Sequence, residues 1–410
     1  MYHGYTLTSK ISFESIIICV KKYVDTNPTT LPIILSIENH CSLYFQKMMA
    51  TILINTLEDK LYMHELTCPL DLIGKVAVKV KRYGEIDDED FDHESTENDV
   101  LDQSTSSCNS SADNVSPTMI VAPELARLAA FHGVKFKSFI TSIDHPAAAT
   151  VHAFKEGKVA SLLSKDPLNL ERWKEYNKRH FSRIYPQNVD SSNYNPLVAW
   201  KIGCQFVALN YQTDDYAMSI NAGRFRENGG CGYICKPVST FTSDGGRCML
   251  NSMQLKIKVL AGLCLPKVYG ESTGSVSEPY VIVRLYDVHE INSSSSSVLT
   301  TELEASITNR QTRSIQNNGF CPAWNHPDHF IFHVISVDVA MVEFVVMDKH
   351  RGRIDDVLCK AAIPVSCLRQ GFRNVHFYDA CGSQHGTFGF ASLLVEVDMK
   401  NPARGTRASQ

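Results

Sequence analysis

Residues 182–237 decide the fold, and they read SRIYPQNVDSSNYNPLVAWKIGCQFVALNYQTDDYAMSINAGRFRENGGCGYICKP. The run from Cys204 to Asn210 is apolar and lies between polar turns, which is typical of a strand buried on both faces of a parallel sheet. The NGGCG segment at residues 228–232 needs a tight turn, because Asn and Gly adopt the positive φ angles of such turns. The stretch therefore predicts part of a parallel sheet that is followed by a glycine turn.

Two side chains in this stretch suit a phosphorylated sugar ring. Arg183 and Tyr185 stand two residues apart, so on a strand they would point to the same face. A guanidinium group can hold a phosphate through two N–H bonds, and an aromatic ring can stack on a neighbouring ring. The alternative is that Arg183 pairs with a surface carboxylate while Tyr185 only packs.

Three ordered blocks carry a family resemblance: SRIYP at 182–186, GCQFVALNYQT at 203–213 and NGGCGYICKP at 228–237. Together they resemble the Y catalytic region of eukaryotic phosphoinositide-specific phospholipase C. YHGYTLTSKI at 2–11 and LPIILSIENHCS at 31–42 resemble the second half of the X region of that family. The resemblance implies a partial (β/α)8 TIM-type barrel and the Ca²⁺-dependent hydrolysis of phosphatidylinositol 4,5-bisphosphate to diacylglycerol and inositol trisphosphate. The letters LNYQTDD favour the epsilon-type branch.

The resemblance also assigns residues to the reaction. The segment from Leu31 to Asn39 is an apolar strand that ends in a carboxylate and an amide, so Glu38 would lie at the carboxyl end of a barrel strand, where active sites of (β/α)8 enzymes lie. By resemblance, Glu38 is a calcium ligand near the inositol 2-hydroxyl and His3 is the second of two active-site histidines. Attack of that hydroxyl on phosphorus would use Ca²⁺ to neutralise charge and a histidine to stabilise or protonate the transition state. The alternative for His3 is a solvated tail.

Two further substrate-binding residues follow from strand alternation and from the family. Lys79 and Lys81 alternate in GKVAVKVKRYG and would face one way on a strand. By resemblance they match paired lysines that bind the 4- and 5-phosphates, just as Arg183 and Tyr185 match residues that contact the headgroup. The alternative for the lysines is an ordinary charge pair on an edge strand.

The family places its first active-site histidine and most of its calcium ligands before the position of His3, and here Met1 and Tyr2 precede it. We therefore expect a fragment that is inactive alone. The competing hypothesis is a non-catalytic lipid-binding or protein-binding scaffold, like the inactive phospholipase C-like proteins.

Charge is distributed unevenly along the chain. Residues 85–116 hold 11 of the 44 acidic residues, so the rest of the chain has 33 acidic residues against 40 basic ones. A basic body suits an anionic membrane surface, which would repel the acidic segment. The segment is poor in apolar residues and is expected to be disordered, as the X/Y linker of the family would be. A solvated spacer with no regulatory role is the alternative.

The C-terminal part resembles a C2 domain. Runs such as PYVIVRLYDV and MVEFVVMD alternate like strands, and NGFCPAWN at 318–325 is a C2 signature. We expect the sandwich to supply its own core, and the serines at 293–297 to form a flexible loop. Clustered loop carboxylates bind Ca²⁺ in such domains. The residues that match the family there are Asp348, Asp355 and Asp356.

Two departures leave calcium binding by this C2 domain open. His350 replaces an expected Asp, and Glu278 stands where the first loop usually has Asp. Lipid or intramolecular docking without calcium is the alternative. The expected organisation is the end of the X region at 1–83, the linker at 84–117, the Y region at 118–245, the C2 domain at 250–400 and a disordered tail at 401–410.

The remaining composition limits localisation and partners. The 13 cysteines are scattered without a zinc-finger spacing, which indicates reduced thiols in the cytoplasm. We expect peripheral membrane association, because no apolar run is long enough to cross a bilayer. Basic residues are not clustered with aromatics, so nucleic acid is not an expected partner. Anionic phosphoinositide membranes are expected partners. By resemblance, small GTPases or G proteins would activate the full-length enzyme.

Overall fold

The computed structural model describes residues 10–64, 68–81, 121–144, 149–166, 168–187, 190–237, 240–241, 252–267, 276–295, 298–325, 327–379 and 382–400. His3, the acidic linker and the C-terminal tail lie outside these residues. The chain divides into two compact units, residues 1–136 with 147–152 and residues 137–146 with 153–410.

The first unit contains parallel strands and helices. Its elements are α1 (Phe13–Thr26), β1 (Ile33–Ser36), α2 (Leu43–Leu57), β2 (Leu61–Tyr62), β3 (Val76–Lys81), α3 (Pro123–Ala126), β4 (Ala129–Gly133) and the first half of β5 (Thr150–Lys155). β3 pairs in parallel with β1, β2 and β4, and β4 pairs in parallel with β5. Val76, Val78 and Val80 of β3 are buried against α1 and α2, so the other face of β3 carries its polar residues.

The second unit begins with the continuation of this α/β pattern. Its elements before the sandwich are α4 (Phe139–Asp144), α5 (Glu156–Lys165), α6 (Asn169–Arg179), β6 (Phe181–Tyr185), α7 (Leu197–Lys201), β7 (Phe206–Val207) and α8 (Tyr216–Phe225). β6 and β7 are parallel, and Trp173 of α6 is fully buried beside Phe139 and Phe154. The prediction of a strand buried on both faces at 204–210 is wrong. β7 is short and half-buried, because β6 is its one strand neighbour among the described residues.

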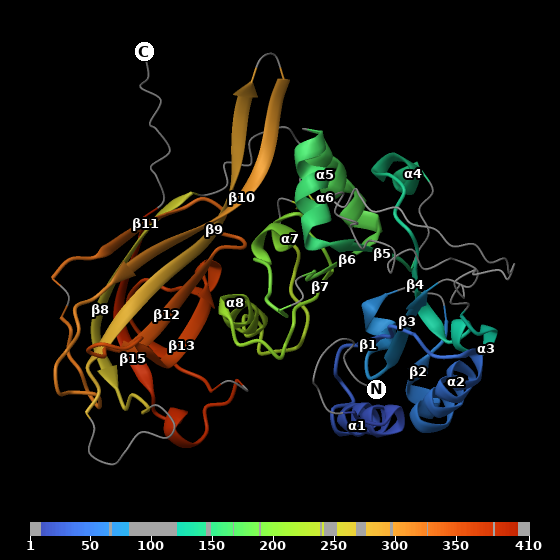
Figure 1. Ribbon diagram of the computed structural model, residues 1–410, viewed down its shortest axis with the longest axis horizontal. Coiled ribbons are helices and arrows are strands. Elements are labelled where there is room, and N and C mark those ends of the chain that lie inside the picture. Colours follow the sequence, from blue (N-terminus) through green and yellow to red (C-terminus); the bar gives the residue numbers. More distant parts are fainter. Residues whose placement is uncertain are drawn as a thin grey trace, which may run out of the picture. The chain divides into compact units, whose positions relative to one another are not determined.

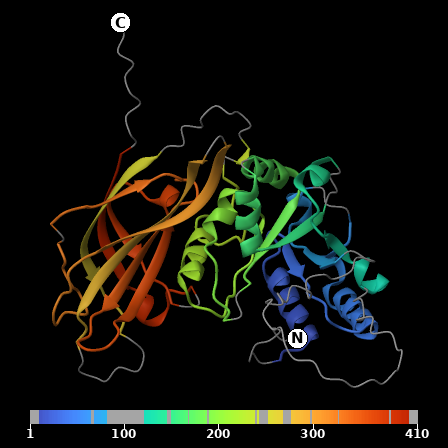
Figure 2. The ribbon, with the colours of Figure 1, turned by 45° about the horizontal axis from the view of Figure 1, so that its top comes forward.

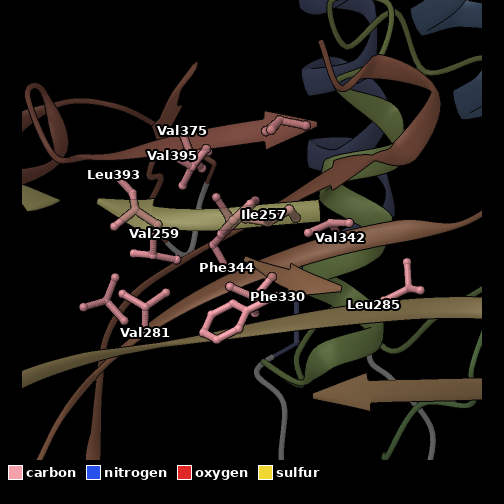
Figure 3. Close-up of a cluster of buried hydrophobic side chains, with 14 of the residues drawn as sticks. Ile257, Val259, Val281, Leu285, Phe330, Val342, Phe344, Val375, Leu393 and Val395 are labelled. Carbon is pink, nitrogen blue, oxygen red and sulfur yellow. The ribbon is translucent and has the colours of Figure 1, made fainter. Parts of the chain in front are cut away.

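Two antiparallel sheets follow in the same unit (Figure 1). Their strands are β8 (Met253–Leu263), β9 (Pro279–Ser295), β10 (Val298–Gln311), β11 (Phe330–Val334), β12 (Met341–Asp348), β13 (Asp356–Pro364), β14 (Gly371–His376) and β15 (Ser392–Lys400). The sheet orders are β10-β9-β12-β13 and β11-β8-β15-β14. Apolar side chains from both sheets meet between them, as Figure 3 shows for Ile257, Val281 and Phe344.

The predicted serine loop at 293–297 is also wrong in its first part. Residues 293–295 belong to β9 and pair with residues 298–300 of β10, because ladder hydrogen bonds of the long hairpin outweigh the low strand preference of serine. The combination of helix-flanked parallel strands and a two-sheet sandwich confirms the predicted α/β plus all-β fold class.

Helices α7 and α8 cover the outer face of one sandwich sheet (Figures 1 and 2). Leu197, Trp200 and Ile220 pack there against Tyr286 and Met341. The same contact holds a nearly buried ion pair between Lys201 Nζ and Asp338 Oδ1 at 3.1 Å, and the rings of Tyr216 and Tyr286 stack at 5.5 Å. The sandwich therefore shares a second apolar core with the α/β part of its unit.

Candidate functional site

Three of the predicted residues, Glu38, Lys79 and Lys81, lie just after β1 or on the neighbouring β3 in the first unit. Ser36 pairs with Lys79 in the register, and Lys79 Nζ donates to Ser36 Oγ at 3.5 Å, so these side chains share a face. Ile37 is buried on the opposite face, with its N–H donating to Lys79 O at 3.0 Å. Glu38 comes directly after Ile37 and is exposed, so strand alternation places it on the face of Lys79 and Lys81.

The loop after Glu38 is held by a buried glutamine. The side chain of Gln46 is fully buried in α2, where its Nε2 donates to Cys41 O at 2.8 Å and its Oε1 accepts from Ala122 N at 2.7 Å. Asn39 Oδ1 accepts from Cys41 N at 3.1 Å. These bonds fix the backbone that carries Glu38 to the start of α2.

Arg183 and Tyr185 lie together on β6 in the second unit. Ser182 and Ile184 are buried, while Arg183 and Tyr185 are half-buried on the other face. The Arg183 guanidinium lies over the Tyr185 ring at 5.0 Å from its centroid. The predicted alternation is therefore present, and it produces a cation beside an aromatic face. This pair belongs to the second unit, whereas Glu38, Lys79 and Lys81 belong to the first.

A buried polar cluster supports β6 from behind. Ser182 Oγ donates to Asn177 Oδ1 at 2.6 Å, and Gln205 Oε1 accepts from Ser182 N at 2.9 Å. Lys236 Nζ donates to Asn177 O, and burial lowers the pKa of Lys236 to about 8. Sequence reasoning missed Lys236, although it stands inside the third family block.

The glycine turn beside Lys236 is largely as predicted. Gly229, Gly230 and Gly232 have φ angles of 80°, 76° and 83°, which L-residues with side chains rarely adopt. Asn228 is not among the residues with positive φ; its side-chain amide donates to Tyr233 O across the turn. Asparagine therefore closes the turn by hydrogen bonding, while the three glycines supply its unusual backbone.

The carboxylates predicted for C2 calcium bind protein donors instead. Asp348 Oδ1 accepts from Glu278 N at 2.7 Å, and Asp355 accepts from His350 N at 2.9 Å and from Tyr280 Oη at 2.8 Å. Asp356 Oδ2 lies 3.2 Å from Arg353 Nη2. Among the described residues no group of three or more His, Cys, Asp or Glu side chains is arranged to hold a metal ion. Calcium would have to compete with these protein donors, and Asp348, Asp355 and Asp356 stay predicted calcium ligands.

The described residues also offer too few ligands for the predicted catalytic calcium. Calcium takes six to eight oxygen ligands, and Glu38 offers one carboxylate. The described residues alone therefore do not form a calcium site, and Glu38 stays a predicted contributor to one. None of the helices in the described ranges is long and apolar enough to cross a membrane.

Three family descriptions match consecutive parts of the chain. "Phosphatidylinositol-specific phospholipase C, X domain" matches residues 1–82, the Y domain of the same name matches residues 125–239, and "C2 domain" matches residues 253–380. The order of the matches is the order expected from the sequence blocks.

Curated relatives agree with these matches. Human "1-phosphatidylinositol 4,5-bisphosphate phosphodiesterase delta-1" is 31% identical over 98% of this chain and 53% of its own length. Mouse "Inactive phospholipase C-like protein 2" is 32% identical over 99% of this chain and 36% of its own length. The chain thus spans about half or less of the length of these relatives. The relatives do not test the preference for the epsilon-type branch, which stays a prediction.

Solved structures show the same fold. The crystal structure of L. pealei PLC21 matches 98% of this chain and 49% of its own chain with a TM-score of 0.72 at 23% identity. The structure of S. officinalis PLC21 matches 99% of this chain with a TM-score of 0.73 at 24% identity. At such identities the likeness shows the fold alone, and it supports the partial TIM-type barrel followed by a C2 sandwich.

Proposed function

Since the chain belongs to the phosphatidylinositol-specific phospholipase C family, we propose that it serves the Ca²⁺-dependent hydrolysis of phosphatidylinositol 4,5-bisphosphate to diacylglycerol and inositol trisphosphate. One observation supports this proposal: Ser36 at the end of β1 lies beside Lys79, so alternation continued past the strand would bring Glu38 to the face of Lys79 and Lys81. A carboxylate beside two ammonium groups suits a site that handles a phosphorylated ring and a cation together.

Each residue has a proposed role. Lys79 and Lys81 bind the ring phosphates as point charges, and Arg183 holds a headgroup phosphate through its planar N–H fork beside the Tyr185 ring. Glu38 contributes a carboxylate oxygen to Ca²⁺, which when bound would neutralise charge that develops on the phosphate. His3, outside the described residues, would stabilise or protonate the transition state, as the family resemblance implies.

We propose a peripheral, cytoplasmic location at an anionic membrane for this reaction. The excess of basic over acidic residues outside residues 85–116 supports it, because such a surface attracts anionic lipid. Activation of longer forms by small GTPases or G proteins belongs to the same proposal and rests on the family resemblance.

A second candidate function is a non-catalytic scaffold that binds phosphoinositides. The similarity to the mouse inactive phospholipase C-like protein favours it. The two candidates share headgroup binding and differ in hydrolysis, so one binding measurement tests what they have in common.

The experiment is isothermal titration of the 410-residue chain with inositol 1,4,5-trisphosphate. We expect Arg183→Gln, or Lys79→Gln combined with Lys81→Gln, to weaken binding by about 10- to 100-fold, the range of one or two lost charge-assisted contacts. Lys75→Gln is the matched control, because Lys75 precedes β3 and its Nζ donates to Asp59 O at 2.6 Å. Equal affinities of all these variants and the unmodified chain would overturn the proposed site.

A further inference from the structure

Lys155 is the last residue of β5, which is the sheet neighbour of β6 (Figure 1). The buried indole of Trp173 in α6 contacts one face of both strands. Its ring lies 5.1 Å from the ring of the buried Phe154, and its Nε1 donates to Oγ of the buried Ser182 at 3.5 Å. Because side chains alternate along a strand, Lys155 and Arg183 both lie on the face opposite α6.

Lys155 also lies at the same end of the sheet as Tyr185. The carboxylate of Glu156 accepts a hydrogen bond from the backbone N–H of Gln187, two residues after Tyr185. A Cβ on Gly157 would lie 3.2 Å from Nε2 of the Gln187 side chain. Neighbouring strands are about 4.8 Å apart. The ends of β5 and β6 therefore lie side by side, with Lys155 on one and Tyr185 on the other.

Two cations and an aromatic ring on one face suit a phosphate that is attached to a ring. The Arg183 guanidinium lies over the Tyr185 ring at 5.0 Å, and both it and Lys155 are half-buried, so each remains partly open to solvent. Phosphate offers three acceptor oxygens, which is enough to accept from an ammonium group and a guanidinium group at once. The chain thus places two donors of different shape where one phosphate can meet both.

We propose that Lys155 is a specificity-determining residue of the headgroup site, where its ammonium group binds the same ring phosphate as Arg183. This role rests on the proposed binding of a phosphoinositide headgroup and deepens it. The second cation makes affinity for the ring depend on this phosphate more strongly than Arg183 alone would. Lys155 takes no part in the bond-breaking step, so a non-catalytic scaffold would use it in the same way.

The test is isothermal titration of the 410-residue chain with inositol 1,4,5-trisphosphate. Lys155→Gln should weaken binding by about 5- to 10-fold, the scale of one partly exposed charge-assisted contact. Lys155→Arg keeps the cation and should bind within about twofold of the unmodified chain. The matched control is Lys165→Gln, because Lys165 is exposed at the other end of α5, about 15 Å away along the helix. This control should leave the affinity unchanged.

Combining Lys155→Gln with Arg183→Gln separates this role from the proposed function. If the two side chains hold one phosphate, the double variant should lose less than the product of the single losses, because a phosphate without one cation is held more loosely by the other. Normal affinity of Lys155→Gln beside weakened Arg183→Gln would overturn the role of Lys155 and leave the proposed site intact. A fully multiplicative loss would also overturn it. Unchanged affinity in both single variants would overturn the proposed site and this role together.

Inorganic phosphate distinguishes a ring phosphate from a free anion. We expect it to bind at least about 100-fold more weakly than the trisphosphate, because it lacks the ring and the other phosphates. Equal affinity for the two ligands would overturn the role of Lys155 in headgroup recognition. Thermal unfolding of Lys155→Gln should match that of Lys165→Gln. An affinity loss that appears only with a lower Tm would indicate a structural role of Lys155 and would likewise overturn the proposal.

Discussion

Gly223 lies where α8 packs on the sandwich, so the substitution Gly223→Ala tests that contact. A Cβ at this position would lie 2.9 Å from Ala362 Cβ and closer still to the carbonyl oxygen of Ala362. Ala362 is held in the β12–β13 ladder opposite Glu343, so its backbone cannot turn away. Gly223→Ala must therefore push α8 from the sheet and loosen the Tyr216–Tyr286 stack.

The expected cost combines two effects. Overpacking of this kind costs about 1–3 kcal/mol, and disturbing an aromatic pair adds roughly 1 kcal/mol. Alanine recovers about 0.5–1 kcal/mol through its better helix propensity. The free energy of unfolding should therefore fall by about 1–3 kcal/mol. For a unit of this size, that corresponds to a decrease in Tm of about 3–10 °C.

Calorimetry of the whole chain measures this change. The matched control is Gly157→Ala in α5, where the nearest atoms belong to the flexible Gln187 side chain at 3.2 Å. That variant should be neutral or slightly stabilised. If Gly223→Ala is as stable as Gly157→Ala, then α8 does not pack on β13 as described.

Three other changes have defined outcomes. Deleting residues 85–116 should raise binding to anionic vesicles at low salt and change it little at high salt, because salt screens the acidic charge beyond about 8–10 Å. Unchanged binding at both salt concentrations would mean that the segment is only a tether. The folded pKa of Lys236 is about 8 against an ordinary 10.5, so the unfolded chain binds more protons between these values and stability should rise with pH there. In urea unfolding at pH 7.5 and 9.5, Lys236→Met should lack this rise of about 1–2 kcal/mol, and an identical rise in the variant would show that Lys236 does not cause it. Residues 252–400 alone should unfold cooperatively yet self-associate in sedimentation, since Tyr286 and Met341 lose their cover; a monomer at all concentrations would contradict this.

Strand periodicity predicted much of the fold. The run MVEFVVMD coincides with β12, and Trp324 of the NGFCPAWN signature is 1% exposed, with its Nε1 donating to Pro279 O at 3.2 Å. Alternation also gave the shared faces of Lys79 with Lys81 and of Arg183 with Tyr185. These features could be predicted because the two-residue alternation of a strand, and hence its buried face, can be recognised from neighbouring residues alone.

The remaining features depend on contacts between distant segments. Glu343 is 1% exposed and accepts from Tyr286 Oη at 2.8 Å and Arg284 Nη1 at 3.1 Å, on the outer face of its sheet. The expected core of the sandwich itself is present, but no local pattern shows that α7 and α8 add a second apolar contact on this face. Likewise, Asp355 matched a calcium ligand in sequence, but its partner Tyr280 lies 75 positions away.

Hydrolysis tests the central claim most directly. The 410-residue chain would be combined with the polypeptide that precedes the matched stretch in the human delta-1 relative and supplied with vesicles of phosphatidylinositol 4,5-bisphosphate. We predict inositol trisphosphate release that requires Ca²⁺ and falls at least about 100-fold in Glu38→Gln, the scale of a lost transition-state contact. Glu14→Gln, in the first turn of α1, should keep full activity. Release that is independent of Ca²⁺, or that is unchanged in Glu38→Gln, would contradict the account.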